Sequence, residues 1–230
     1  IQKSSNVGSA KIALGMAPEV LWDLFDDVGF GMPPKLGFPG EANGKLRPFK
    51  TWKPIEQATM SYGHGIAVSL VQLARAYTIF ARDGELVPLS LLRVDMPVAG
   101  RRVLAPETAR DVRRMLEMAV QPGGTAPRAQ IMGYRVAGKT GTAHKLEGGG
   151  YAPDKYVSSF VGFAPASNPR LVIAVMVDEP TAGQYYGGLV AAPIFARVME
   201  GSLRALGVAP DAPMKPIELP AAGSEVKESV

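Results

Sequence analysis

A lysine set among small hydroxyl and glycine residues is the feature of this sequence best suited to chemistry. Lys139, Thr140, Gly141 and Thr142 follow a strand-like run that begins at Val136. The lysine supplies a positive charge, the threonines supply hydroxyls, and the glycine removes a side chain that would keep a ligand off the backbone. Such a strand can accept an extended, carboxylate-bearing peptide as one more strand. The motif alone is short, and a solvated lysine beside a tight bend is the alternative.

A second short motif lies near the start of the chain. Ser4 and Asn6 form a Ser-x-Asn element, and Ser5 between them is expected to point away from any site. Ser-x-x-Lys, Ser-x-Asn and Lys-Thr-Gly elements occur together in penicillin-binding proteins and class A β-lactamases. The pair of motifs therefore favours acyl transfer through a serine.

From Ser4 to about Gly207 the sequence resembles the class B penicillin-binding proteins, specifically the division-specific peptidoglycan D,D-transpeptidases of Gram-negative bacteria. Beyond Ser-x-Asn, the stretches that carry the resemblance are Arg135–Ala143, Phe160–Ala166, Asp178–Pro180 and Tyr185–Gly188. The resemblance implies an α+β fold in which an antiparallel sheet, with at least three strands in this chain, packs between helices. This is the penicillin-binding, serine β-lactamase-like fold, here incomplete. We expect residues 1–207 to be the C-terminal portion of the transpeptidase domain and residues 208–230 to be a tail.

The family's nucleophile is a serine in a Ser-x-x-Lys element upstream of Ser-x-Asn. The one Ser-x-x-Lys element in these 230 residues runs from Ser224 to Lys227, after the other two, in a Pro- and Ala-rich segment without a helical pattern. We reject Ser224 as the nucleophile. We expect the chain to carry two of the three elements and to be inactive by itself.

The resemblance implies a role for each polar residue of the two motifs. Ser4 would relay a proton between the absent lysine, Lys139 and the leaving amine. Asn6 would hold the substrate's amide through its own donor and acceptor groups. Lys139 would attract the substrate's carboxylate, with hydrogen bonds from Thr140 and Thr142. The backbone N–H of Thr142 would form half of the oxyanion hole.

Strand geometry and one loop complete the expected site. Strict alternation places Lys139 and Gly141 on one face of the strand and both threonines on the other, so they share a pocket only along the edge of an edge strand. Tyr186 and Gly187 match a family loop beside the site, where an aromatic wall could cover the ligand. Packing of that loop against the last helix is an equal alternative.

The resemblance also implies partners and a location. Peptidoglycan stem peptides ending in D-Ala-D-Ala would be substrates, β-lactams would be inhibitors, and divisome proteins would be partners at the periplasmic face of the inner membrane. Membrane attachment would come only through an anchor absent from this chain. A β-lactamase or D,D-carboxypeptidase on the same scaffold, and a non-catalytic fragment, remain alternatives. No glutamate between the two motifs stands in the context of a class A deacylating residue.

Composition narrows the cofactors and partners further. The chain has no cysteine and two histidines, His64 and His144, so we expect neither a metal nor any other cofactor. The net charge is +4, and the arginines concentrated between residues 101 and 135 lack interleaved aromatics, which favours a solvated basic face over nucleic-acid binding. No apolar run approaches the roughly 18 residues that span a bilayer.

The apolar pattern predicts the elements that must position these residues. Ser69 and Gln72 form a capping box at the start of a helix. The segment from Phe30 to Gln57 reads as a long loop, with Phe38, Phe49 and Trp52 as candidate anchors. Further helices are expected over residues 18–28, from Pro106 onward and over about 192–206, the last presenting Phe195, Val198, Met199 and Leu206.

The expected strands lie on either side of one short turn. Residues 157–163 and 171–178 are predicted to pair antiparallel with each other. The second of them is apolar without alternation, so both of its faces should be covered. Asp178 and Glu179 at its end are expected to be solvated.

Overall fold

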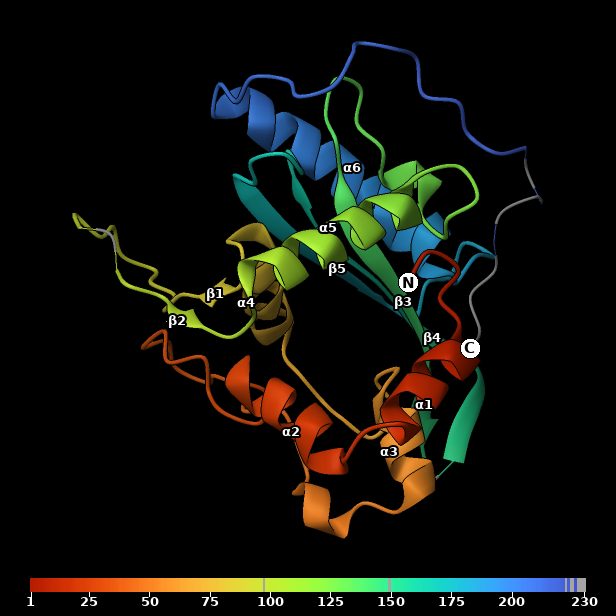
Figure 1. Cartoon of the computed structure of the whole chain (residues 1–230). Helices are drawn as coiled ribbons and strands as arrows, with labels where there is room; N and C mark the ends of the chain where they lie inside the picture. Colours follow the sequence, from red (N-terminus) through yellow and green to blue (C-terminus); the bar gives the residue numbers. More distant parts are fainter. Residues whose placement is uncertain (97, 149, 222, 224–225, 227–230) are drawn as a thin grey trace. The chain divides into compact units, whose positions relative to one another are not determined.

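The computed structural model describes residues 1–96, 98–148, 150–221, 223 and 226, without the side chain of Pro153. The chain divides into two compact units, one of residues 1–4 and 107–230 and the other of residues 5–106 (Figure 1). Ser4 and the Lys-Thr-Gly-Thr stretch belong to the first unit, and Asn6 belongs to the second.

The first unit is built on a three-stranded antiparallel sheet. Its strands are β3 (Ala137–Glu147), β4 (Gly150–Ala164) and β5 (Leu171–Asp178), in the order β3-β4-β5. This confirms the antiparallel α+β fold and the bounds expected for β5. The middle strand begins at residue 150, earlier than expected, because β3 and β4 pair almost to the tip of their hairpin.

One long helix covers a face of this sheet. α6 (Gly187–Ala205) packs against all three strands and against the 3-10 turn η2 (Pro127–Ala129). α5 (Pro106–Val120) contributes its last residue to the same core. The buried members of that core come from the end of α5, the segment between α5 and β3, the sheet and α6: Val120, Ala126, Ala129, Ile131, Val136, Phe160, Ala164, Ala191, Ala192, Phe195, Met199 and Leu203.

Two expectations for this unit are wrong in part. α6 begins at Gly187, five residues before the predicted start, and Val198 and Leu206 are exposed instead of buried. In the sheet formed by the described residues, β5 lies at an edge, and none of its residues is fully buried; Met176 is 54% exposed. An apolar run without alternation therefore does not prove that both faces of a strand are covered.

The residues that follow α6 are held against the same unit. Tyr134 donates its hydroxyl proton to the Val208 carbonyl (2.6 Å). The carboxylate of Asp211 accepts hydrogen bonds from the Arg135 backbone N–H (2.7 Å) and from the Ser167 hydroxyl (2.6 Å). Where the domain ends stays a prediction.

The second unit consists of helices and one short hairpin. Its elements are α1 (Asn6–Leu14), α2 (Pro18–Asp27), η1 (Phe49–Thr51), α3 (Pro54–Met60), α4 (Leu70–Ala81), β1 (Glu85–Leu86) and β2 (Arg101–Arg102). The capping box at the start of α4 is confirmed, since Ser69 Oγ accepts from the Gln72 N–H and Gln72 Oε1 accepts from the Ser69 N–H.

The expected long loop of this unit is more ordered than its proline and glycine content suggested. It contains η1 and the first turn of α3, for which Pro54 supplies a favourable first residue. Phe49 contacts the ring of Trp22, and Trp52 donates its indole N–H to the Arg47 carbonyl, but Phe38 is 64% exposed and is therefore not a buried anchor.

The buried Gln72 side chain fastens this segment. Its Nε2 lies within hydrogen-bond distance of the backbone carbonyls of Gly29, Met32 and Asn43 (3.2, 2.7 and 2.9 Å). Among the helices that the structure describes, none has both the length and the apolar character needed to cross a bilayer.

Candidate active site

The two sequence motifs meet through a lysine and a serine. Lys139 Nζ, on β3, donates a hydrogen bond to Ser4 Oγ at 2.8 Å, across 135 positions of sequence. Ser4 has a left-handed backbone with φ 52°, which is uncommon for a residue other than glycine. Its N–H donates to the Ile1 carbonyl in a tight turn. A strained residue whose side chain meets a charged group is typical of functional sites.

The Lys139 side chain is long enough to pass the edge of β3 and reach a threonine that starts on the opposite face of the strand. Thr140 pairs with Phe160 and Thr142 with Ser158, so both threonines face α6, while Lys139 and Gly141 start on the opposite face. Within the described residues β3 pairs with β4 alone and leaves its other edge open. The ammonium of Lys139 reaches the carbonyl oxygen of Thr140 at 3.1 Å and its Oγ1 at 3.0 Å. The charge of Lys139 and the hydroxyl of Thr140 therefore meet at the strand edge.

The start of α6 is docked on β3 through Thr142 and two glycines. The Gly187 N–H donates to Thr142 Oγ1 at 2.9 Å. A Cβ at Gly187 would lie 2.4 Å from the Ser159 carbonyl oxygen, and one at Gly188 would lie 2.0 Å from that of Thr125. Only glycine allows this approach, which places the expected residue Gly187 beside Thr142.

Gly141 lies against Ser159 of the adjacent strand, a neighbour that the sequence did not predict. A Cβ there would lie 2.6 Å from Ser159 Oγ, and the same hydroxyl donates to the Gly141 carbonyl at 3.3 Å. The absence of a side chain at Gly141 thus makes room for a residue of the adjacent strand.

Four rings form a continuous stack beside these residues. Tyr156 and Tyr185 lie 4.0 Å apart with an interplanar angle of 12°, His144 lies 4.4 Å from Tyr156, and Tyr186 lies 4.5 Å from Tyr185. The Ser158 hydroxyl donates to the Tyr185 carbonyl and holds the loop before α6. Desolvation, followed by the proximity of Tyr185, raises the pKa of Tyr156. Tyr186, which directly precedes α6, therefore belongs to an aromatic wall that also packs on the sheet.

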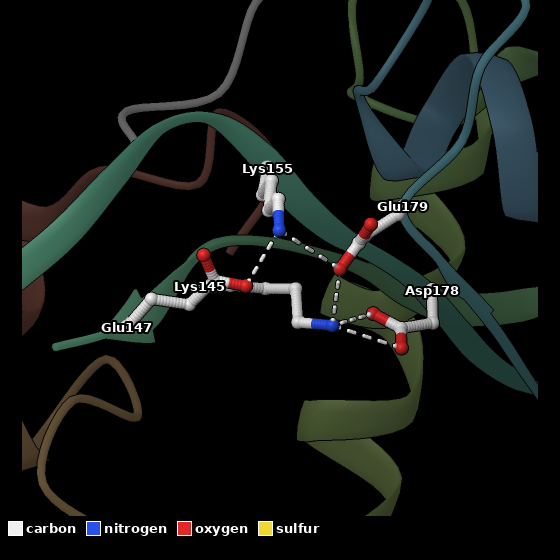
Figure 2. Close-up of polar contacts among 5 residues, drawn as sticks. All are labelled: Lys145, Glu147, Lys155, Asp178 and Glu179. Atoms are coloured by element: carbon white, nitrogen blue, oxygen red, sulfur yellow. Dashed lines mark hydrogen bonds and ion pairs between the residues drawn. The ribbon is translucent and has the colours of Figure 1, made fainter.

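A network of ion pairs links the three strands at the end of the sheet where β3 ends, β4 begins and β5 ends. Figure 2 shows the ammonium of Lys145 between Asp178 and Glu179 (2.9 and 2.7 Å), and that of Lys155 at 2.7 Å from Glu147. Hydrogen bonds to Glu179 and Asp178 raise the pKa of Lys145, and one to Glu147 raises that of Lys155. Asp178 and Glu179 are thus paired as well as partly exposed, which the expectation of solvated side chains missed.

The remaining candidate residues lie at the start of α1 or outside the described part of the chain. Asn6 is the first residue of α1 and is partly buried. Ser5 caps the same helix by accepting a hydrogen bond from the Gly8 N–H at 3.1 Å. Ser224 and Lys227, the rejected Ser-x-x-Lys pair, lie outside the described residues.

Sequence reasoning missed three hydroxyl residues at the site. Ser158 and Ser159 lie opposite Thr142 and Gly141 on β4, so the strand register was the signal that could have found them. Thr125 carries no such signal. It lies in the segment between α5 and β3, and its Oγ1 is 2.9 Å from Thr140 Oγ1.

Comparison with known proteins places this geometry in context. The family model described as "Penicillin binding protein transpeptidase domain" matches residues 1–200. The chain is 48% identical over 214 residues to "Probable peptidoglycan D,D-transpeptidase PenA" of Neisseria flavescens, covering 93% of this chain and 54% of that protein. It is 44% identical over 212 residues to "Peptidoglycan D,D-transpeptidase FtsI" of Escherichia coli K12, covering 92% of this chain and 36% of that protein.

A solved structure of a penicillin-binding protein domain also matches the chain. The structure titled "Apo structure of TP domain from Burkholderia pseudomallei penicillin-binding protein 3" is 55% identical with a TM-score of 0.89, covering 93% of this chain and 65% of that one. The chain therefore spans between about a third and two thirds of the length of these proteins.

Proposed function

The chain belongs to the family of penicillin-binding protein transpeptidase domains, and from this premise we propose that it is part of a peptidoglycan D,D-transpeptidase acting through a serine acyl-enzyme. The observation that carries the proposal is the 2.8 Å hydrogen bond from Lys139 Nζ to Ser4 Oγ, because it joins two motifs far apart in the sequence. The acylated serine belongs to the Ser-x-x-Lys element of the whole protein, which does not precede Ser4 in these 230 residues.

Ser4 acts as the proton relay. An ammonium group can only donate, so the Lys139 ammonium occupies a lone pair of Ser4 Oγ and leaves the Ser4 proton to point elsewhere. A hydroxyl oriented in this way can pass its proton to the leaving amine and take another from the lysine of the Ser-x-x-Lys element. Asn6 holds the substrate's amide and that same lysine.

Lys139 also attracts the substrate's terminal carboxylate. The partly buried ammonium lies at the open edge of β3, where an extended peptide can add as a further strand. The hydroxyls of Thr140 and Thr142 add hydrogen bonds, and Gly141 belongs to the same binding edge. This arrangement suits a peptide that ends in a carboxylate and a β-lactam that carries one.

The oxyanion of the tetrahedral intermediate binds to the backbone N–H of Thr142 and to that of the acylated serine. Each donor of such a hole contributes about 2.7–4 kcal/mol to catalysis. Gly187, which donates to Thr142 Oγ1, sets the position of this segment, and Tyr186 forms a wall over the ligand.

The proposal extends to substrate, partners and location. Stem peptides ending in D-Ala-D-Ala are the substrates, cross-linked during septal wall synthesis, and β-lactams are the inhibitors. The whole protein acts with divisome proteins at the periplasmic face of a Gram-negative inner membrane, held by an anchor outside this chain. Residues 1–207 form the C-terminal portion of the transpeptidase domain, and residues 208–230 form a tail.

Covalent labelling with a fluorescent penicillin tests this function. The full-length protein, with its Ser-x-x-Lys element, should be labelled, and the 230-residue chain should not. Lys139→Ala in the full-length protein should slow labelling by orders of magnitude, because the carboxylate loses its counter-charge and Ser4 loses its donor. An unchanged rate would mean that β3 is only scaffolding, and labelling of the short chain at one of its own serines would overturn the assignment. Hydrolysis of stem peptides without cross-linking would favour a carboxypeptidase.

A further inference from the structure

A buried glutamine outside both motifs holds the helix that carries Asn6. Gln57 lies in α3 and is 8% exposed, and α3 packs beside α1 in the same unit (Figure 1). Its Nε2 donates to the backbone carbonyls of Ala13 at 2.8 Å and Met16 at 2.9 Å, across 44 and 41 positions of sequence. One side chain therefore ties the last turn of α1, and the turn that follows it, to α3.

The amide of Gln57 suits this position because its Nε2 carries two protons, one for each carbonyl. Carbonyls at the end of a helix lack partners within the helix and carry a partial negative charge, so they favour a donor. Of the residues of α1, all of which the structure describes, only Ala13 is buried, and Val7 and Ile12 are 65% and 69% exposed. Within this chain the Gln57 amide thus supplies a directional contact where apolar packing is small.

The position of Gln57 is itself set by contacts at the start of α3. Pro54 is the first residue of this helix, and the Gln57 N–H donates to the Lys53 carbonyl at 3.0 Å. The carboxylate of Glu56 accepts a hydrogen bond from the Lys53 N–H at 2.7 Å and forms an ion pair with Arg47 at 2.8 Å. These contacts fix the start of α3, and with it the point from which the amide reaches α1.

We propose that Gln57 is a positioning residue for the transpeptidase reaction and that it sets the place of Asn6 through α1. Asn6 is the first of the nine residues of α1, and the Gln57 contacts lie at the other end of this helix. A short helix moves as a rigid element, so a shift at Ala13 is carried to Asn6. The inference rests on the proposed function, because it concerns the role that Asn6 has there, and it adds a residue that lies in neither motif.

The test is a double-mutant cycle on the acylation of the full-length protein by benzylpenicillin. Gln57→Met keeps the length of the side chain but removes both donors. It should lower the second-order rate constant of acylation roughly 10- to 100-fold, because a misplacement of about 1 Å can cost about 100-fold. The same change in an Asn6→Ala background should lower the rate constant by less than about 2-fold, since a side chain that has been removed cannot be misplaced.

Gln72→Met is the matched control. Gln72 is also a buried glutamine of this unit, and its Nε2 lies within hydrogen-bond distance of three backbone carbonyls, none of which belongs to α1. Its replacement should lower Tm at least as much as Gln57→Met does, because more hydrogen bonds are lost. The acylation rate constant of the folded Gln72→Met protein should stay within about 2-fold of the parent.

A rescue variant separates positioning from general damage. Gln57→Lys restores a donor at the end of α1, where the helix favours a positive charge, and should keep the rate constant within about 5-fold of the parent. This comparison also decides the question if acylation of Asn6→Ala is too slow to measure. Gln57→Asn, whose amide is one methylene shorter, replaces Gln57→Met if that protein does not fold, and should show the same dependence on Asn6.

Three results would overturn the inference while the proposed function stands. They are an unchanged rate constant in Gln57→Met, an equal fall in Gln72→Met or Gln57→Lys, and an equal fall with and without the Asn6 side chain. A parent protein that benzylpenicillin does not acylate would overturn the proposed function, and the inference with it.

Discussion

Replacing Gly187 with alanine should destabilise the protein, although alanine is the better helix former. The new Cβ would lie 2.4 Å from the Ser159 carbonyl oxygen and 2.7 Å from that of Gly141. Both oxygens belong to the backbone of paired strands, which cannot yield independently of the sheet. The start of α6 must therefore move, and the 2.9 Å hydrogen bond from the Gly187 N–H to Thr142 Oγ1 must lengthen.

Three contributions set the size of the effect. Overpacking a close contact costs about 1–3 kcal/mol. A lost hydrogen bond costs about 0.5–1.5 kcal/mol. Alanine recovers at most about 1 kcal/mol of helix propensity. The difference centres on a loss of about 2 kcal/mol, which corresponds to roughly 4–8 °C in Tm for a chain of this length.

Gly201 provides the matched control because it lies in the same helix, at a position where an added Cβ would have no neighbouring atom within 4 Å. Gly201→Ala should raise the stability by up to about 1 kcal/mol. Thermal unfolding followed by circular dichroism on the parent and both variants measures the difference. A Gly187→Ala protein as stable as the parent would refute the close-packing explanation, as would a Gly201→Ala protein that loses as much stability.

Two further predictions concern titration in the folded state. Desolvation raises the pKa of Tyr77 above its usual value, so the folded state holds a proton that the unfolded chain releases above about pH 10. The parent should lose up to about 1.4 kcal/mol more stability per pH unit in that range than Tyr77→Phe, and equal slopes in pH-dependent unfolding would contradict this. The raised pKa of Lys145 likewise means that its ion pairs stabilise the fold below about pH 10.4 and cease to do so as the pH rises through the folded-state value. Lys145→Met should therefore lower Tm at neutral pH, and by less in about 1 M salt, where screening is strong; a difference independent of salt would argue against the ion pairs.

Much of the fold could be predicted from local patterns. The capping box at Ser69 and Gln72, the proline that opens α5 and the apolar run of β5 each act over a few neighbouring residues, so their effect is visible in the sequence. The early start of α6 was not visible. Gly187 and Gly188 disfavour a helix locally, and they occur there because the helix must approach β3 and Thr125 more closely than any side chain allows.

For the site, too, some features could be predicted from the sequence and others could not. The types of residue in Lys-Thr-Gly-Thr and Ser-x-Asn, and the family that they indicate, were readable from the sequence alone, because they depend on the chemistry of side chains. The order of those residues along β3 also showed that Lys139 and the two threonines start on opposite faces.

Only the tertiary structure decided how they come together. β3 has an edge that no strand of the described residues pairs with, and the Lys139 ammonium reaches Thr140 and Ser4 there. Pairing with β4 explains Gly141 through Ser159, and the burial of Thr125 against Thr140 joins a residue of no recognisable motif to the site. Contacts of this kind depend on the register of strands and the docking of a helix, which are properties of the packed chain and leave no local pattern in its sequence.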